Sequence, residues 1–224
     1  MPASFKIPIL FQNDDLIIIS KPAGLPVHSG PGGGETLDDY LHKFQFDKKI
    51  PPTLAHRLDR DTSGCLILGR SKQALRTLGR LFEQGRINKT YWAILDGVPP
   101  QKQMRIDMPL AKITAQAHRW HMKVDPSGQV AITELRVLQE KNGLSLVELK
   151  PKTGRTHQLR VHTQALGCPI IGDKFYGSGN DETQLMLHAR ALRIPYIQND
   201  PAIMVEAPLP DHMLQILQEN GFSI

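Results

Sequence analysis

Cysteine is scarce in this chain, with only Cys65 and Cys168 among its 224 residues. One lies in an apolar run and the other beside a proline, and no paired spacing links them. The sequence therefore excludes a disulfide framework and a cysteine-based metal site. We expect a protein of a reducing compartment, the cytoplasm.

Long apolar runs are also missing. None approaches the roughly 18 consecutive apolar residues that a membrane helix needs. The first residues, MPASFKIPIL, lack the charged start and long apolar core of an export signal. We expect no contact with a membrane and no export.

Acidic residues are outnumbered, 22 Asp and Glu against 27 Lys and Arg, which gives a formal charge of +5. This balance weakly favours a polyanionic partner such as nucleic acid. The hydrophobic content of 40% is ample for a core. Because no internal repeat or long polar linker interrupts the chain, we expect one domain over residues 1–224.

Short strand-like runs alternate with turns and few helices, which favours an α+β fold. A hairpin is expected at Ile9–Phe11 and Leu16–Ser20, and a buried strand at Cys65–Gly69. Further strands are KTYWAILDG, MRIDMPL, AITELRVLQE and LSLVELK, the last two joined by a turn at KNG. Helices are expected at Thr36–Phe46, at Ser71–Gln84, and from an N-cap at Thr156 to Gly167.

The helix expected at Ser71–Gln84 has an apolar side and a basic side. Leu75, Leu78 and Phe82 recur at helical spacing, while Lys72, Arg76 and Arg80 lie four apart on another face. Arg86 and Lys89 extend the positive charge along the chain. Taken alone, this pattern fits a solvated helix face and a phosphate-binding face equally well.

A dense polar stretch, HRLDRDTSGCLILGR, covers residues 56–70. It places Asp59 and Asp61 among His56, Arg57 and Arg60, on a loop that leads into the buried strand. A hydrolase triad of His56, Asp59 and Ser63 would lack the G-x-S-x-G turn that exposes such a serine. The triad is therefore a poor explanation.

Two other kinds of site are disfavoured. The glycines at Gly30–Gly34 have no G-K-[ST] after them, so a phosphate-binding loop is not expected. The pairs His118 with His121 and His157 with His162 have no cysteine or carboxylate at zinc-like spacing. We expect no metal site.

The stretch HRLDRDTSGCLIL resembles the H-R-L-D-x-x-T-S-G signature of RluA-type pseudouridine synthases. Four further motifs follow the family's order: SKPAG from Ser20, KTY from Lys89, GRTHQLRVH from Gly154 and LHA from Leu187. The resemblance covers roughly residues 9–208. It implies a mixed, largely antiparallel bent sheet flanked by helices, with a central active-site cleft.

The resemblance also implies an activity, the isomerisation of a uridine in RNA to pseudouridine, with no cofactor and no metal. In that reaction the glycosidic bond breaks, the uracil rotates, and a carbon–carbon bond joins it to the sugar. We expect a short-form enzyme without an N-terminal S4 domain; the alternative is a catalytic fragment of a longer rRNA enzyme. The enzyme would work as a monomer on large-subunit rRNA or tRNA.

The resemblance assigns the roles of the site residues. Asp59 would be the catalytic carboxylate, with Arg155 as the cation that keeps it ionised and Tyr91 as the base-stacking residue that takes the proton from the uracil. The variable position Asp61 would be a loop or surface acid. The remaining assignments are pocket residues Lys21 and Pro22, loop residue His56, Arg57 in the gap left by a flipped nucleotide, Leu187 under the base, and RNA-backbone contacts at Lys72, Arg76, Arg80, Arg86 and Lys89.

Two other functions stay open. A non-catalytic RNA-binding or RNA-folding protein could use the same scaffold, although the joint presence of Asp59, Tyr91 and Arg155 argues against it. A carboxylate-based nucleoside or glycoside hydrolase would release free uracil rather than an isomer of unchanged mass.

Overall fold

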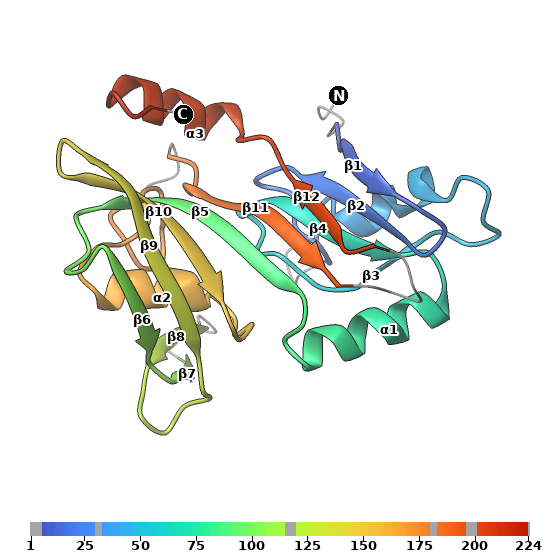
Figure 1. Ribbon diagram of the computed structural model, residues 1–224, viewed down its shortest axis with the longest axis horizontal. Coiled ribbons are helices and arrows are strands. Elements are labelled where there is room, and N and C mark those ends of the chain that lie inside the picture. The colour runs from blue at the N-terminus through green and yellow to red at the C-terminus, as the bar shows by residue number, and fades with distance from the viewer. Residues whose placement is uncertain (1–5, 30–32, 115–119, 180–182, 196–200, 224) are drawn as a thin grey trace. The chain divides into compact units, whose positions relative to one another are not determined.

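The computed structural model describes residues 6–29, 33–114, 120–179, 183–195 and 201–223 (Figure 1). The chain divides into two compact units, Met1–Lys89 with Ala189–Leu209, and Thr90–His188 with Pro210–Ile224. The prediction of one catalytic domain over 1–224 stays a prediction. His118 and part of Gly30–Gly34 lie outside the described residues.

The first unit is built on a sheet with the strand order β1-β2-β4-β11. β3 pairs with β4, and β12 pairs with β11. The pairings β1–β2, β2–β4, β3–β4 and β11–β12 are antiparallel. The strands are β1 (Ile9–Gln12), β2 (Leu16–Lys21), β3 (Thr53–Leu54), β4 (Ser63–Gly69), β11 (Leu187–Ile194), which begins in the second unit, and β12 (Ile203–Glu206).

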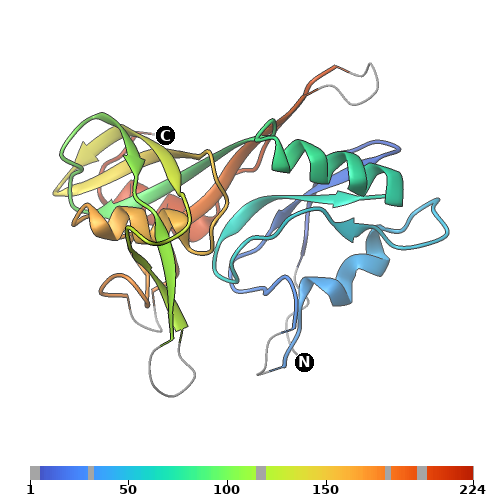
Figure 2. The same cartoon turned by 90° about the horizontal axis from the view of Figure 1, so that it is seen from below.

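Two helices cover this sheet, the 3₁₀ helix η1 (Leu37–Phe44) and the α-helix α1 (Lys72–Glu83). Figure 2 shows them on opposite sides of the strands. Leu78 and Leu81 of α1 pack with Ile18 and Ile67 in the core. Every residue of β4 is buried, as expected for a strand that is covered on both faces.

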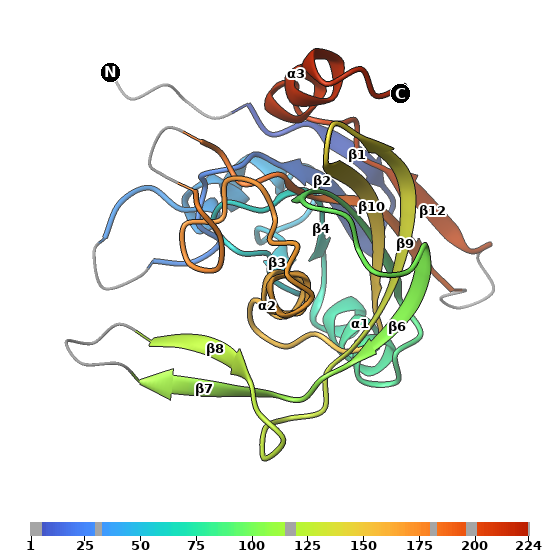
Figure 3. The same cartoon turned by 90° about the vertical axis from the view of Figure 1, so that its left-hand side faces the viewer.

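The second unit contains a sheet with the order β5-β10-β9-β6, antiparallel throughout, and a separate antiparallel pair, β7–β8. Figure 3 shows α2 between this sheet and the β7–β8 pair. The elements are β5 (Asn88–Asp96), β6 (Gln103–Asp107), β7 (Leu110–Thr114), β8 (Trp120–Val124), β9 (Ile132–Lys141), β10 (Leu144–Pro151), α2 (Gln158–Ala165) and α3 (Asp211–Glu219).

The predicted α+β class is confirmed, as are the N-terminal hairpin, the buried strand, the β9–β10 hairpin and the helix that Ser71 caps. The N-cap predicted at Thr156 is wrong. The helix begins at Gln158, and its N-cap is His157, whose φ of 52° is left-handed.

No helix among the described residues has the length and apolar character needed to cross a bilayer.

Gly64 allows β4 and β11 to approach each other. Its φ is +107°, and a Cβ there would lie 2.3 Å from the carbonyl oxygen of Ala189. A larger residue would meet both a strained backbone and a backbone clash, so this signature glycine is a packing requirement.

Gly64→Ala should lower the free energy of unfolding by about 2–4 kcal/mol, because the clash involves backbone that cannot rotate away. Urea unfolding measures the loss. Gly79→Ala in α1 is the matched control, since nothing lies within 4 Å of its Cβ position and its φ is helical. It should be neutral or stabilising by up to about 1 kcal/mol, and equal losses in both variants would contradict the packing argument.

Candidate active site

Asp59 lies in a tight turn just before β4. The Thr62 N–H donates to the Asp59 carbonyl oxygen over 3.2 Å. Leu58 and Thr62 are buried on either side, while Asp59 is half-buried. The turn therefore fixes the backbone of Asp59 and leaves its carboxylate partly accessible.

The side chain of Lys21 binds the backbone of this turn. Lys21 ends β2 and is fully buried, and its Nζ donates to the carbonyl oxygens of Pro22 at 2.8 Å, Leu25 at 2.8 Å and Arg60 at 2.9 Å. An ammonium group has three N–H donors, and each has an acceptor here. One buried cation thus joins the 22–25 segment to the 57–62 loop.

A second set of bonds joins the same two segments. The Gly24 N–H donates to the Arg60 carbonyl oxygen over 3.0 Å, and Arg60 Nε donates to the Gly24 carbonyl oxygen over 3.2 Å. Gly24 has a φ of +84°, a conformation that glycine adopts without strain. The SKPAG and HRLD motifs therefore form one hydrogen-bonded assembly.

Burial and nearby charges act against each other at Lys21. Burial lowers the pKa of Lys21 to about 7, while the Asp61 and Asp59 carboxylates raise it. The two acids thus help to keep the buried amine charged. This gives Asp61, a variable position in the signature, an electrostatic role within the loop.

His56 fixes the start of the loop. Its Nε2 accepts the Ile67 N–H of β4 over 3.0 Å, and its ring centroid lies 4.9 Å from that of Phe82 on α1. Burial, reinforced by the positive charge of Lys89, lowers the pKa of His56 to about 3. A neutral ring can accept this hydrogen bond, and a protonated ring cannot.

Arg155 in the second unit is exposed, and its Nε donates to the Val130 carbonyl oxygen over 3.1 Å. Its backbone N–H donates to Gln158 Oε1 over 3.0 Å. Tyr91 lies on β5 opposite Leu149 of β10 and is half-buried. Leu187, at the start of β11, is buried.

Gln158, which is not among the predicted site residues, organises the loop that carries Arg155. Its Oε1 also accepts from the Thr153 hydroxyl at 2.6 Å, and its Nε2 donates to the Ile132 carbonyl and the Thr133 hydroxyl, both at 2.9 Å. All four hydrogen-bonding positions of this buried amide are used. The amide thus fixes the loop that leads into α2.

The predicted site residues fall into two groups. The first group lies in the first unit and consists of Lys21, Pro22, His56, Arg57 and Asp59. A hydrogen bond from Lys21 to the Arg60 carbonyl joins the 22–25 segment to the 57–62 loop, and His56 binds β4. Tyr91, Arg155 and Leu187 lie in the second unit. The charged residues Lys72, Arg76, Arg80 and Arg86 are exposed, whereas Lys89 is half-buried and burial lowers its pKa.

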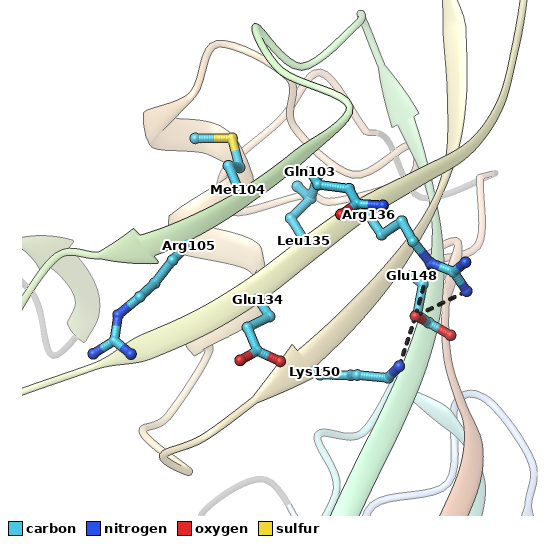
Figure 4. Close-up of a pocket in the computed structure, with 8 residues that line it drawn as sticks. All are labelled: Gln103, Met104, Arg105, Glu134, Leu135, Arg136, Glu148 and Lys150. Carbon is cyan, nitrogen blue, oxygen red and sulfur yellow. Dashed lines mark hydrogen bonds and ion pairs between the residues drawn. The ribbon is translucent and has the colours of Figure 1, made fainter.

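A pocket on the sheet of the second unit is separate from these residues (Figure 4). Its Glu148 carboxylate lies 3.2 Å from Arg136 and 2.8 Å from Lys150. Its other charged residues, Arg105 and Glu134, pair with Asp107 and Lys152. Because every charged side chain of the lining has an ionic partner, we assign the pocket no part in the site. No cluster of three or more metal-ligating side chains occurs in the part of the chain that the structure describes.

A family model described as RNA pseudouridylate synthase matches residues 15–165. The chain belongs to this family. The resemblance inferred from the motifs is confirmed, and so are the pseudouridine synthase fold and the isomerase activity on RNA.

Individual relatives agree with this assignment. An uncharacterised RNA pseudouridine synthase of Zymomonas mobilis is 48% identical over 205 residues, covering 90% of this chain and 93% of the relative. Ribosomal large subunit pseudouridine synthase C of Buchnera aphidicola is 32% identical, over 95% of this chain and 70% of that protein. The structure of human RNA pseudouridylate synthase domain containing 4 matches with a TM-score of 0.81 at 30% identity, covering 96% of this chain and 94% of that one.

The low pKa of His56 makes this pseudouridine synthase sensitive to acid. Between about pH 6.5 and pH 3 the unfolded chain binds a proton at His56 that the folded chain does not, so the free energy of unfolding falls as the pH is lowered. His56→Gln keeps an acceptor but does not titrate. It should reduce the difference in unfolding free energy between about pH 7 and about pH 5, measured by urea unfolding.

Some pH dependence should remain in His56→Gln, because burial also lowers the pKa of His162 and of His212. If the free energy of unfolding changes as much between the two pH values in His56→Gln as in the unmodified chain, His56 does not couple protonation to folding.

Proposed function

We propose that this enzyme isomerises specific uridines in structured RNA and that Asp59 is its catalytic carboxylate. The observation that carries the proposal is the fixed position of the Asp59 turn, which the buried Lys21 and the neutral His56 hold from two sides. A reacting group held in one geometry lowers the entropic part of the barrier. Such support is expected for a residue that must meet a sugar or a uracil ring correctly.

The reaction needs one group to assist bond breaking and another to move a proton. Asp59 assists at the sugar or the uracil ring as the N1–C1′ bond breaks. The uracil rotates, and C5 bonds to C1′. The C5 proton then leaves, with Tyr91 as the group that takes it, and N1 gains a proton, so the product has the same mass as the substrate.

Arg155 supplies positive charge to the site in this proposal, which favours the ionised form of the Asp59 carboxyl. The geometry of its loop supports a positioned guanidinium, because the Gln158 amide and the Val130 carbonyl both bind Arg155. Leu187 packs under the base. Lys21 and Pro22 brace the pocket next to the Asp59 turn.

The uridine must leave its stack to reach a half-buried carboxylate, so the enzyme flips the nucleotide. Arg57 is exposed beside the buried anchor Leu58, which suits a side chain that fills the vacated space. Lys72, Arg76, Arg80 and Arg86, with Lys89, follow the RNA backbone. On α1 the buried residues are Ala74, Leu78 and Leu81, so the basic side is available to phosphates.

Large-subunit rRNA is the first substrate to test, because the Buchnera relative is named for the large ribosomal subunit, and tRNA is the second. We further propose that residues 1–224 act as one monomeric catalytic domain in the cytoplasm. The isomerisation transfers no net electrons, so it calls for no redox cofactor, and no metal is part of the proposal.

Asp59→Asn should reduce turnover by at least about a thousandfold, because the amide keeps the shape of the side chain but not its charge. Tritium release from RNA labelled at uracil C5 measures turnover, with large-subunit rRNA and bulk tRNA as parallel substrates. RNA affinity should change little.

Asp61→Asn is the matched control for that experiment, since it removes a neighbouring carboxylate from the same loop. It should retain far more turnover than Asp59→Asn, because Asp59 still helps to keep Lys21 charged when Asp61 is neutral. Substantial turnover in Asp59→Asn would remove Asp59 from its role. Tight RNA binding by the unmodified chain without tritium release would favour a non-catalytic RNA-binding protein, and free uracil as product would favour a hydrolase.

A further inference from the structure

Phe175 is an aromatic residue presented to solvent in the segment that follows α2. Its side chain is 62% exposed. Isolated hydrophobic residues are common on protein surfaces, so exposure alone carries no inference. What distinguishes Phe175 is the buried polar framework that holds it.

The framework begins with a buried ion pair. Arg160 Nε donates to Asp173 Oδ2 over 2.7 Å and its Nη2 donates to Oδ1 over 2.8 Å, and both residues are at most 5% exposed. Asp173 Oδ1 also accepts the backbone N–H groups of Phe175 at 2.9 Å and Tyr176 at 3.0 Å. The backbone at Phe175 is therefore fixed from within the unit.

Aromatic neighbours fix the ring itself. The Phe175 centroid lies 5.8 Å from that of His157 and 6.3 Å from that of Tyr176, and the Arg160 guanidinium carbon lies 5.3 Å from the Phe175 centroid. The Tyr176 hydroxyl is within 2.9 Å of His157 Nδ1 and accepts the Met122 N–H over 3.0 Å. The ring is backed by protein while most of its surface stays exposed.

Two exposed cations lie close to this segment along the chain. Lys174 is exposed and adjacent in the chain, and the exposed Arg155 lies two residues before His157. An exposed flat ring on a fixed backbone, in a segment that also carries exposed cations, suits a nucleobase attached to phosphate, because stacking and phosphate attraction can then act together.

We propose that Phe175 is a stacking platform for an unpaired base of the RNA substrate, outside the uridine that reacts. The inference rests on the proposed function for the existence of an RNA substrate, but it does not depend on Asp59. Stacking on a ring tolerates any base, so Phe175 adds affinity for single-stranded segments rather than selecting a sequence.

The test measures the affinity of the full chain for a fluorescein-labelled oligouridylate. Phe175→Ala should weaken binding by about five- to a hundredfold, the range for loss of one base–aromatic stack. Phe175→Trp should bind at least as tightly as the unmodified chain, and its tryptophan fluorescence should fall on addition of RNA beyond the change that the unmodified chain shows.

Phe46→Ala is the matched control, because Phe46 is a similarly exposed phenyl ring at 53%. It should leave the affinity unchanged. The fold-decrease in RNA affinity caused by Phe175→Ala should also be equal at low and high salt, because stacking releases no counterions. Loss of a phosphate contact would instead change the salt dependence of the affinity. Equal unfolding midpoints show that the variants are folded.

Unchanged affinity in Phe175→Ala, or an equal loss in Phe46→Ala, would overturn the proposal. So would unchanged RNA affinity together with altered self-association in sedimentation, which would make Phe175 a protein contact. These outcomes are independent of turnover, so they are distinguishable from a failure of the Asp59 experiment.

Discussion

The ammonium group of Lys21 is the interaction on which the rest of the candidate site depends. It lies at the end of the mostly buried strand β2 and binds three backbone carbonyls, one of which belongs to the loop that carries Asp59. A buried charge is costly unless it is fully hydrogen-bonded, and removing it would leave the carbonyls without this donor. The conformation of both segments is therefore coupled to one side chain.

In the second unit, too, buried polar side chains hydrogen-bond the backbone of loops. The buried Gln158 amide holds the Arg155 loop, and the buried Arg160–Asp173 pair holds the Phe175 segment. In each case a buried polar side chain satisfies the backbone of a loop, and the loop then presents a more exposed side chain. Polar groups fully satisfied in a low-dielectric interior define one conformation, which suits residues that must meet a substrate in a fixed geometry.

Sequence patterns predicted the parts of the fold in which side-chain periodicity follows burial. The apolar spacing of Leu75, Leu78 and Phe82 predicted α1, and the apolar run after Ser63 predicted β4. The N-cap predicted at Thr156 is wrong because the chain enters α2 through the left-handed His157, while the buried Gln158 amide binds both the local Arg155 loop and the distant Ile132–Thr133 segment. The motifs named Lys21 and Arg155, but no local pattern indicates that Lys21 is buried or that Gln158 binds Arg155.

The most direct test of this account is amide hydrogen exchange in Lys21→Met, a variant of similar length that cannot donate. If the ammonium holds the two segments together, the Gly24 and Thr62 amides should exchange at least about tenfold faster, while amides in the middle of α1 keep their protection. Unchanged exchange at Gly24 and Thr62 would show that the segments hold their conformation without Lys21, and would contradict the account.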